Sequence, residues 1–226
     1  MGTRLRPYTF VVPKPLIPIG TKPIVELLLE NLAGQGISDA YLAVGYHAEL
    51  LQAYLGDGSR VGLPLRYYRE RERLGTAGPI RMVRDEFELR QPLLALNADI
   101  LTRVDFRRLF AFHEERQACL TVGVRIYRQT IPFGRLSVDD AARVVAIEEK
   151  PQLAFPVSAG IYVLEERAVD RIPPGRFFDM PDLVTALIEA GELVVAFEIT
   201  EPWTAIEDAA DWQRVMDATD PGKDPE

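Results

Sequence analysis

The sequence predicts an α/β protein with a mixed, mainly parallel sheet, and three observations lead to this class. Short runs rich in β-branched residues alternate with segments of helical period along most of the chain. The composition, 47% hydrophobic and 27% charged over 226 residues, is globular and excludes disordered and fibrous classes. The last third is richer in strand-like runs in hairpin order, which predicts an antiparallel part of the same sheet.

Helices are expected where apolar residues recur with the helical period, as Ile24, Leu28 and Leu32 do. The expected helices are residues 23–35, 47–55, 79–87, 105–116, 180–190 and 209–218. The expected strands are residues 40–44, 65–69, 93–96, 120–125, 144–148, 157–164 and 194–199. The length suits a single domain over residues 1–216, followed by a polar, flexible tail over residues 217–226.

Net charge and cysteine content narrow the function classes. The chain has 26 Lys and Arg against 34 Asp and Glu, and its net charge of −8 argues against a nucleic-acid-binding protein. The single cysteine, Cys119, excludes an intrachain disulfide and fits a reducing compartment. No apolar run approaches the roughly 20 residues of a membrane span, and no signal-peptide pattern is present. We therefore expect a cytoplasmic protein that binds neither membranes nor nucleic acid.

The first 25 residues depart from this acidic average, because they contain Arg4, Arg6, Lys14 and Lys22 and no acidic residue. Such a stretch is either a solvated surface or an anion site. The glycine at Gly2 favours an anion site, since glycine lets a phosphate approach backbone N–H groups while Arg and Lys supply positive charge. The stretch contains neither a Walker loop nor a dinucleotide-binding fingerprint.

Four further segments follow expected strands, where ligands bind in open α/β sheets. The run LGTAGP at residues 74–79 either makes room for a nucleotide or forms a tight strand-to-helix turn. Asp99, at the end of LLALNAD, either holds Mg²⁺ or forms a cap or turn. Glu149 and Lys150, within EEKP, either orient a ligand or form an exposed ion pair. Ser158, within VSAGIY, offers a hydroxyl that donates and accepts hydrogen bonds.

These motifs resemble those of the sugar-1-phosphate nucleotidylyltransferases, and the similarity extends along nearly the whole chain. It lies in GTRLRPYT…PKPLIPIGTKP, in LGTAGP, in the Asp after the strand, in EEKP and in SAGIY. The resemblance implies a Rossmann-like three-layer nucleotidyltransferase fold and condensation of an NTP with a sugar 1-phosphate to NDP-sugar and pyrophosphate. The LGTAGP form is most similar to members that use GTP, so GTP and a mannose-1-phosphate-like sugar are the expected substrates.

The same resemblance implies roles for individual residues. The nucleotide is assigned to Gly2, Thr3, Gly75, Thr76 and Ala77. Catalysis is assigned to Arg4, Lys14 and Asp99, where Lys14 contacts phosphates and Asp99 binds the expected cofactor, Mg²⁺. The sugar phosphate is assigned to Gly134, Glu149, Lys150 and Ser158. His47 and His113 match no catalytic pattern and receive no role.

Two positions depart from the family's pattern. Ala205 stands where the family has a second carboxylate for the metal. Either Mg²⁺ rests on Asp99, waters and phosphates, or Glu207 or Asp208 reaches the ion, or metal-dependent catalysis is weakened. Met1 stands where the family's first strand ends, so that strand is expected to be missing. Either the chain begins downstream of its true start, or the protein is a degraded homologue.

The departures leave a second function open. It is a catalytically weak or silent homologue that binds sugar nucleotides or regulates a partner. The oligomeric state is open as well.

Overall fold

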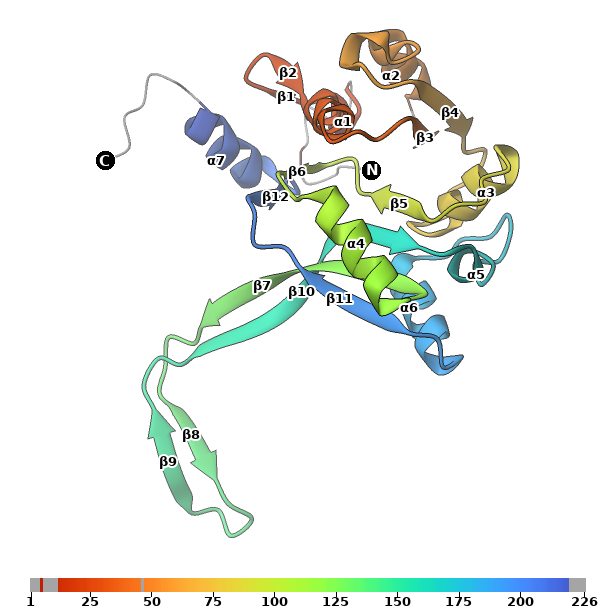
Figure 1. The fold of residues 1–226 in the computed structure, drawn as a ribbon. Coiled ribbons are helices and arrows are strands. Elements are labelled where there is room, and N and C mark those ends of the chain that lie inside the picture. The colour runs from red at the N-terminus through yellow and green to blue at the C-terminus, as the bar shows by residue number, and fades with distance from the viewer. Residues whose placement is uncertain (1–4, 6–11, 46, 220–226) are drawn as a thin grey trace.

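The computed structural model describes residue 5, residues 12–45 and residues 47–219 of the chain. A four-stranded sheet lies in the order β11 (Val194–Glu198), β7 (Leu120–Thr130), β10 (Gln152–Leu164) and β5 (Leu93–Leu96). A separate parallel pair is formed by β3 (Ala40–Val44) and β4 (Leu65–Arg69). Helices pack around these strands (Figure 1), which confirms the α/β class.

The sheet is mixed, as expected, but it contains more antiparallel pairing than the sequence predicted. β10 runs antiparallel to both of its neighbours, β5 and β7. Within the four-stranded sheet the parallel pair is that of β11 and β7. The expectation of a mainly parallel sheet is therefore wrong for this sheet. The reason is that β7 returns as β10 through a hairpin, which needs no crossover helix.

The longer helices begin and end close to the predicted positions. They are α1 (Ile24–Gly34), α2 (Ala48–Leu55), α3 (Gly78–Glu86), α4 (Phe106–Arg116), α6 (Met180–Glu189) and α7 (Ala209–Thr219). Short elements escaped prediction: the 3₁₀ turns Lys14–Leu16 and Ser59–Val61, β1 (Pro18–Ile19), β2 (Lys22–Pro23), β6 (Ile100–Thr102), α5 (Glu166–Val169) and β12 (Trp203–Ala205). Pieces this short carry too few residues to show a hydrophobic period.

The C-terminal helix changes one expectation. α7 continues through Thr219, so residues 217–219 are helical and do not belong to a flexible tail. Residues 220–226 lie outside the described residues. The indole N–H of Trp212 donates to the carbonyl of Pro18 at 2.8 Å, which fastens α7 to β1. Among the described residues no helix has the length and apolar character that a bilayer crossing needs.

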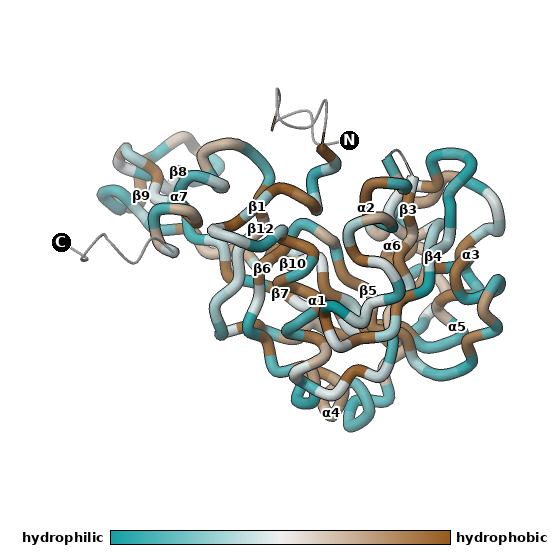
Figure 2. Tube along the Cα trace, turned by 90° about the horizontal axis from the view of Figure 1, so that it is seen from above, coloured by the Kyte–Doolittle hydropathy of each residue, from teal (hydrophilic) through white to brown (hydrophobic). Residues whose placement is uncertain are grey.

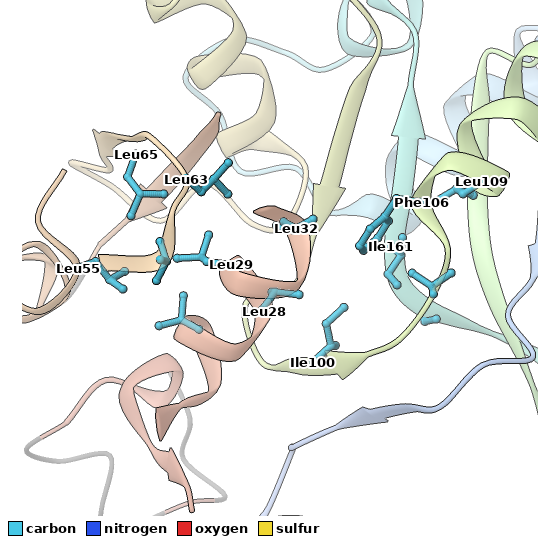
Figure 3. Close-up of a cluster of buried hydrophobic side chains, with 14 of the residues drawn as sticks. Leu28, Leu29, Leu32, Leu55, Leu63, Leu65, Ile100, Phe106, Leu109 and Ile161 are labelled. Atoms are coloured by element: carbon cyan, nitrogen blue, oxygen red, sulfur yellow. The ribbon is translucent and has the colours of Figure 1, made fainter. Parts of the chain in front are cut away.

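The largest cluster of buried apolar side chains joins α1 to the strands. Leu28 and Leu32 of α1 lie beside Ile100 of β6, and Phe106 and Ile161 continue the cluster (Figure 3). Ile100 and Phe106 are 1% exposed and Ile161 is fully buried. Each such side chain contributes about 1.5–3 kcal/mol to folding by leaving water. Figure 2 shows the corresponding hydrophobic stretches along β5, β7 and β10.

One part of the molecule projects from this body. The outer halves of β7 and β10 continue into the hairpin of β8 (Arg135–Val138) and β9 (Val144–Glu148), and we call residues 126–157 the arm. In Figure 1 the arm extends away from the helices and the remaining strands. Among the described strands β8 and β9 pair with each other alone, and all of their residues are exposed.

The ladder between β10 and β7 is interrupted where the arm meets the body. Ser158 pairs with Val124, and the next pair is Tyr162 with Val122, so β10 contains extra residues here. The backbone groups freed by this bulge bond elsewhere. The carbonyl of Ala159 accepts the indole N–H of Trp203 at 2.9 Å, and the carbonyl of Gly160 accepts the Asn97 N–H at 2.9 Å.

Candidate active site

The centre of the candidate site is an ion pair between Lys14 and Asp99. Lys14 opens the 3₁₀ turn Lys14–Leu16, and Asp99 lies between the end of β5 and the start of β6. The Lys14 ammonium donates to Asp99 Oδ2, and the two side chains are 16% and 28% exposed. Partial burial strengthens such a pair, because less water screens it. A positive charge is thereby held at the carboxyl end of a sheet strand, where α/β folds bind ligands.

The neighbouring strand brings Ala205 beside this pair. Ala205 pairs with Ile100, and the Ile206 N–H donates to the Asp99 carbonyl at 3.0 Å. The methyl group of Ala205 offers no ligand to a metal. Asp208 caps α7 instead of turning toward Asp99, since its Oδ1 accepts the N–H groups of Ala210 and Asp211, both at 2.9 Å.

Asn97 and Gly160 form the wall next to Asp99. Gly160 has a φ of +69°, and a Cβ at this residue would lie 2.6 Å from Asn97 Nδ2. A side chain at this residue would have to displace the Asn97 side chain, and the positive φ favours glycine as well. Asn97 is not among the residues predicted from the sequence, although its place two residues before Asp99 was a usable signal. Ser158 stands at the start of the same bulge, and its hydroxyl is 2.8 Å from that of Tyr162.

The run LGTAGP packs against the start of α6. A Cβ at Gly75, whose φ is +80°, would lie 2.5 Å from the Phe178 carbonyl oxygen. The Thr76 N–H and hydroxyl both donate to Asp179 Oδ1, at 2.9 and 3.1 Å, and Ala77 is fully buried. The alternative of a tight strand-to-helix turn therefore describes the packing of this run. Ala77 therefore offers no exposed side chain to a nucleotide. Asp179, which accepts both hydrogen bonds from Thr76, was not predicted from the sequence.

Glu70 is a second residue that the sequence reasoning missed. It directly follows β4 and lies close to the LGTAGP run, since its carboxylate accepts a backbone hydrogen bond from Leu74. Burial raises the pKa of Glu70, and the bond from Leu74 offsets part of that rise. Carboxyl groups with such pKa values are frequent at functional sites. Its position at a strand end was the signal that the sequence offered.

The arm carries the remaining predicted sugar-phosphate residues. Gly134 and Glu149 are neighbours, because a Cβ at Gly134 would lie 3.1 Å from Glu149 Oε2. Lys150 follows with a φ of +48° and is exposed. From Gln152, next to this corner, β10 extends six residues to Ser158, which is about 20 Å of strand. The structure therefore brings Gly134, Glu149 and Lys150 together but separates them from Ser158.

The predicted nucleotide residues Gly2, Thr3 and Arg4 lie outside the described residues. Leu5, which follows them in the sequence, is 1% exposed and belongs to a buried cluster with Ile17, Ile19, Ile24 and Ile206.

The two histidines have structural surroundings. His113 lies in α4, where its Nδ1 is 2.7 Å from Thr121 Oγ1 and its Nε2 is 3.2 Å from Glu165 Oε1. His47 stands at the start of α2 with a φ of +62°.

The part of the chain that the structure describes holds no large cluster of metal-ligating side chains. No group of three or more His, Cys, Asp or Glu side chains in that part could hold a metal ion. The centre fits a Mg²⁺ ion that takes one protein ligand, the carboxylate of Asp99. Water molecules and phosphate oxygens would supply the remaining ligands of such an ion.

Comparison with protein families assigns the chain to one family. Residues 1–219 match the family described as "Nucleotidyl transferase". The chain belongs to this family. Membership confirms the resemblance that the sequence motifs indicated.

Curated relatives within the nucleotidyl transferase family differ in the substrates that their names carry. Mannose-1-phosphate guanylyltransferase of Mycobacterium tuberculosis is 36% identical over 177 residues, which are 77% of this chain and 49% of that protein. UTP–glucose-1-phosphate uridylyltransferase of Synechocystis is 30% identical over an alignment of 233 positions, which covers 95% of this chain and 60% of that protein. The chain thus spans about half the length of the curated relatives it matches.

Solved structures confirm the fold. A putative glucose-1-phosphate thymidylyltransferase from Bacillus anthracis superimposes with a TM-score of 0.75 at 19% identity, covering 100% of this chain and 94% of that one. HddC from Yersinia pseudotuberculosis superimposes with a TM-score of 0.71 at 22% identity, covering 92% and 90%. The Rossmann-like nucleotidyltransferase fold expected from the motifs is therefore present.

Proposed function

We propose that this chain catalyses nucleotidyl transfer from an NTP to a sugar 1-phosphate. An oxygen of the sugar phosphate attacks the α-phosphorus of the NTP, the bond to the bridging oxygen of the β-phosphate breaks, and pyrophosphate leaves with the electron pair. The observation that carries the proposal is the Lys14–Asp99 pair at the carboxyl end of β5. Phosphoryl-type transfer depends on positioning and charge neutralisation, which such a pair supplies.

Lys14 acts on the phosphates, and Asp99 holds its ammonium in place. When the nucleotide enters, phosphate oxygens compete with Asp99 for the Lys14 ammonium, so the cation moves to the charge that develops in the transition state. Asp99 would then hold Mg²⁺ together with phosphate oxygens, and the ion would supply further neutralisation of the triphosphate. Arg4 serves the same phosphates, while Gly2 and Thr3 offer backbone N–H groups to them.

For the substrates we infer GTP and mannose 1-phosphate. The LGTAGP run and the name of the mycobacterial relative support this choice. Gly75 and Thr76 contact the base from a turn that the Phe178 carbonyl and the Asp179 carboxylate hold in place. Ser158 contacts the sugar at the start of the bulge. Glu149 and Lys150, with Gly134 beside them, bind the same sugar phosphate after the arm bends toward the body, because about 20 Å of extended strand separates them from Ser158.

The test is a pyrophosphate-release assay with GTP and mannose 1-phosphate, repeated with UTP and glucose 1-phosphate. Lys14→Ala should lower turnover by about 100-fold or more, because it removes the charge that stabilises the transition state. Lys22→Ala is the matched control. Lys22 also lies in the basic N-terminal stretch and is also paired, but its partner is Glu30, whose Oε1 lies 2.6 Å from Lys22 Nζ. Equal rates for the Lys14 variant and the native chain would remove Lys14 from the site.

One observation favours a second function. The methyl group of Ala205 beside Asp99 leaves the centre with one carboxylate, which suits a homologue that binds sugar nucleotides without turning them over. The same assay separates the two functions when equilibrium binding of GTP is measured alongside it. Binding with no pyrophosphate release from any substrate pair would establish the silent homologue and overturn the enzyme.

A further inference from the structure

The LGTAGP run is joined to the residues in front of α6 by backbone hydrogen bonds. The Phe178 N–H donates to the Leu74 carbonyl at 2.9 Å. The Phe178 carbonyl accepts the N–H groups of Ala77 and Gly78, at 2.9 and 3.0 Å. The two segments are distant in the sequence, so their pairing belongs to the tertiary structure and fixes where the run lies.

Both polar hydrogens of Thr76 are directed to one side chain in front of α6. Its N–H donates to Asp179 Oδ1 at 2.9 Å, and its hydroxyl donates to the same atom at 3.1 Å. The hydroxyl oxygen in turn accepts the N–H of Met180, the first residue of α6, at 2.8 Å. A threonine has one backbone N–H and one hydroxyl hydrogen, so neither is left for a ligand. The polar groups of Thr76 therefore serve the position of the run.

Asp179 is itself held in place by α6. It directly precedes this helix, and its N–H donates to Asp182 Oδ2 at 3.2 Å. The helix is fixed in the interior, since Leu183 is fully buried and Met180 is 3% exposed within the cluster that contains Ala77. The Asp179 carboxylate is therefore a fixed acceptor to which the LGTAGP run is attached.

The backbone that carries Thr76 is exposed and adaptable. Residues 71–73, which lead from β4 into the LGTAGP run, are all exposed, and so is Thr76. Gly75 has a φ of +80°, and glycine populates positive and negative φ about equally well. The chain here has other conformations available to it, and the bonds to Asp179 select one of them.

We propose that Asp179 is a positioning residue for the nucleotide, which holds Gly75 and Thr76 in the conformation that the base contacts. The inference rests on the proposed function, in which these two residues contact the base. A segment that must be ordered during binding reduces affinity by the cost of ordering it, and a segment that is already ordered does not. Asp179 bonds to the LGTAGP run and to α6, whereas the Lys14–Asp99 pair lies at the end of β5. Asp179 should therefore act on affinity for the nucleotide and leave the rate of the chemical step unchanged.

The experiment measures the dissociation constants of GTP and UTP by titration calorimetry, and kcat and the KM of each substrate in the pyrophosphate-release assay. For Asp179→Ala, the dissociation constant and the KM of the nucleotide that the native chain binds should rise by about 10-fold, because the nucleotide must then order the run. The kcat and the KM of the sugar phosphate should change by less than about twofold. Asp179→Asn should restore native affinity, since its amide oxygen also accepts from an N–H and a hydroxyl.

The matched control is Asp105→Ala. Asp105 also precedes a helix, α4, and its Oδ1 accepts the Arg108 N–H at 3.1 Å, so this variant removes a carboxylate cap that is bonded to its own helix instead of to the LGTAGP run. It should bind the nucleotide as tightly as the native chain does. A second variant, Thr76→Val, keeps the size of the side chain and removes its hydroxyl, and it should raise the dissociation constant by about threefold. Thr76→Val decides the proposal if circular dichroism shows that Asp179→Ala is unfolded.

Each remaining outcome decides the proposal. Equal nucleotide affinity of Asp179→Ala and the native chain overturns it. Equal weakening by Asp179→Ala and Asp105→Ala reflects a general loss of stability and overturns it too. A lower kcat with an unchanged KM for the nucleotide would place Asp179 in the chemical step, which also contradicts the proposal. Failure of the proposed function is distinct because it lies in the native chain: if that chain binds neither GTP nor UTP and releases no pyrophosphate, the function and this inference are both overturned.

Discussion

The two parts of the candidate site are held in different ways. Lys14 and Asp99 lie in the body, partly buried, and the strand that precedes Asp99 is part of the central sheet. Glu149 and Lys150 lie on the arm, where every residue of the adjoining hairpin strands is exposed. The body can fix the position of a charged group to a fraction of an ångström, since packed cores resist deformation. A two-stranded ribbon has no comparable support.

This difference assigns different properties to the two substrates. In the proposed reaction the triphosphate meets groups that are already in position, which lowers the cost of reaching the transition state. The sugar phosphate meets groups whose position follows the orientation of the arm. We therefore expect the body to set the rate of the chemical step and the arm to set affinity for the sugar phosphate.

The largest effect should come from Phe106→Ala, which tests whether stability resides in the body. Phe106 is 1% exposed within the largest apolar cluster, so its loss should lower the free energy of unfolding by about 3–5 kcal/mol. Phe133→Ala is the matched change on the arm. Because Phe133 is 72% exposed, the free energy should change by less than about 0.5 kcal/mol. Urea unfolding measures both. If the two variants lost similar amounts of unfolding free energy, stability would not reside mainly in the body.

A smaller effect is expected from Gly75→Ala, which tests how rigidly the body holds the LGTAGP turn. The φ of +80° and the 2.5 Å approach to the Phe178 carbonyl oxygen should cost more than about 2 kcal/mol of unfolding free energy. Gly175→Ala is the control. Gly175 has a φ of +65° with no atom within 4 Å of an added Cβ, so about 1 kcal/mol of backbone strain is expected. If both variants unfold at the same urea concentration, the Phe178 contact does not constrain the turn.

The smallest effect concerns two acidic groups and pH. The hydrogen bond from Arg84 holds the pKa of Asp170 below its ordinary value, so this pair stabilises the body above the ordinary Asp pKa and loses that effect as pH falls below it. Asp170→Asn should cost less than about 1 kcal/mol at pH 7, since Asp170 is 55% exposed and Arg84 keeps Asp85 and Glu166. The difference from the native chain should shrink steadily as the pH falls below the ordinary Asp pKa.

The matched change on the arm is Asp139→Asn. Hydrogen bonds from Arg143 lower the pKa of Asp139 at the exposed tip, so its contribution also disappears toward acid pH. We expect no measurable change in melting temperature at pH 7, because the tip is outside the cooperative core. A larger loss for Asp139→Asn than for Asp170→Asn would show that the arm unfolds together with the body.

The regular elements were predictable because their patterns are long. The strands 40–44, 65–69 and 93–96 have the predicted bounds, and the long helices differ from prediction by a residue or so at each end. The extent of β7 and β10 was not predictable. Their outer residues, IYRQT at 126–130 and QLAFPV at 152–157, do not alternate polar and apolar side chains and are mostly exposed, so the usual signal of a half-buried strand is absent there.

The candidate site was predictable in part. The motif that ends in Asp99 and the lysine at Lys14 meet in the structure, although 85 positions separate them. Asn97 and Asp179 were missed because their importance arises from distant partners, Gly160 and Thr76. The separation of Glu149 from Ser158 was not foreseen either, since local motifs carry no information on how far a hairpin extends.

The bulge in β10 has a mechanical consequence. One continuous strand passes from the arm into the sheet, and its ladder with β7 is broken between Ser158 and Tyr162. We therefore expect the arm to bend at Ala159 and Gly160. The carbonyl groups of these two residues accept hydrogen bonds from Trp203 and Asn97. Asn97 lies two residues before Asp99 in the sequence. A movement of the far end of the arm would therefore be transmitted to the wall of the candidate site, which Asn97 and Gly160 form.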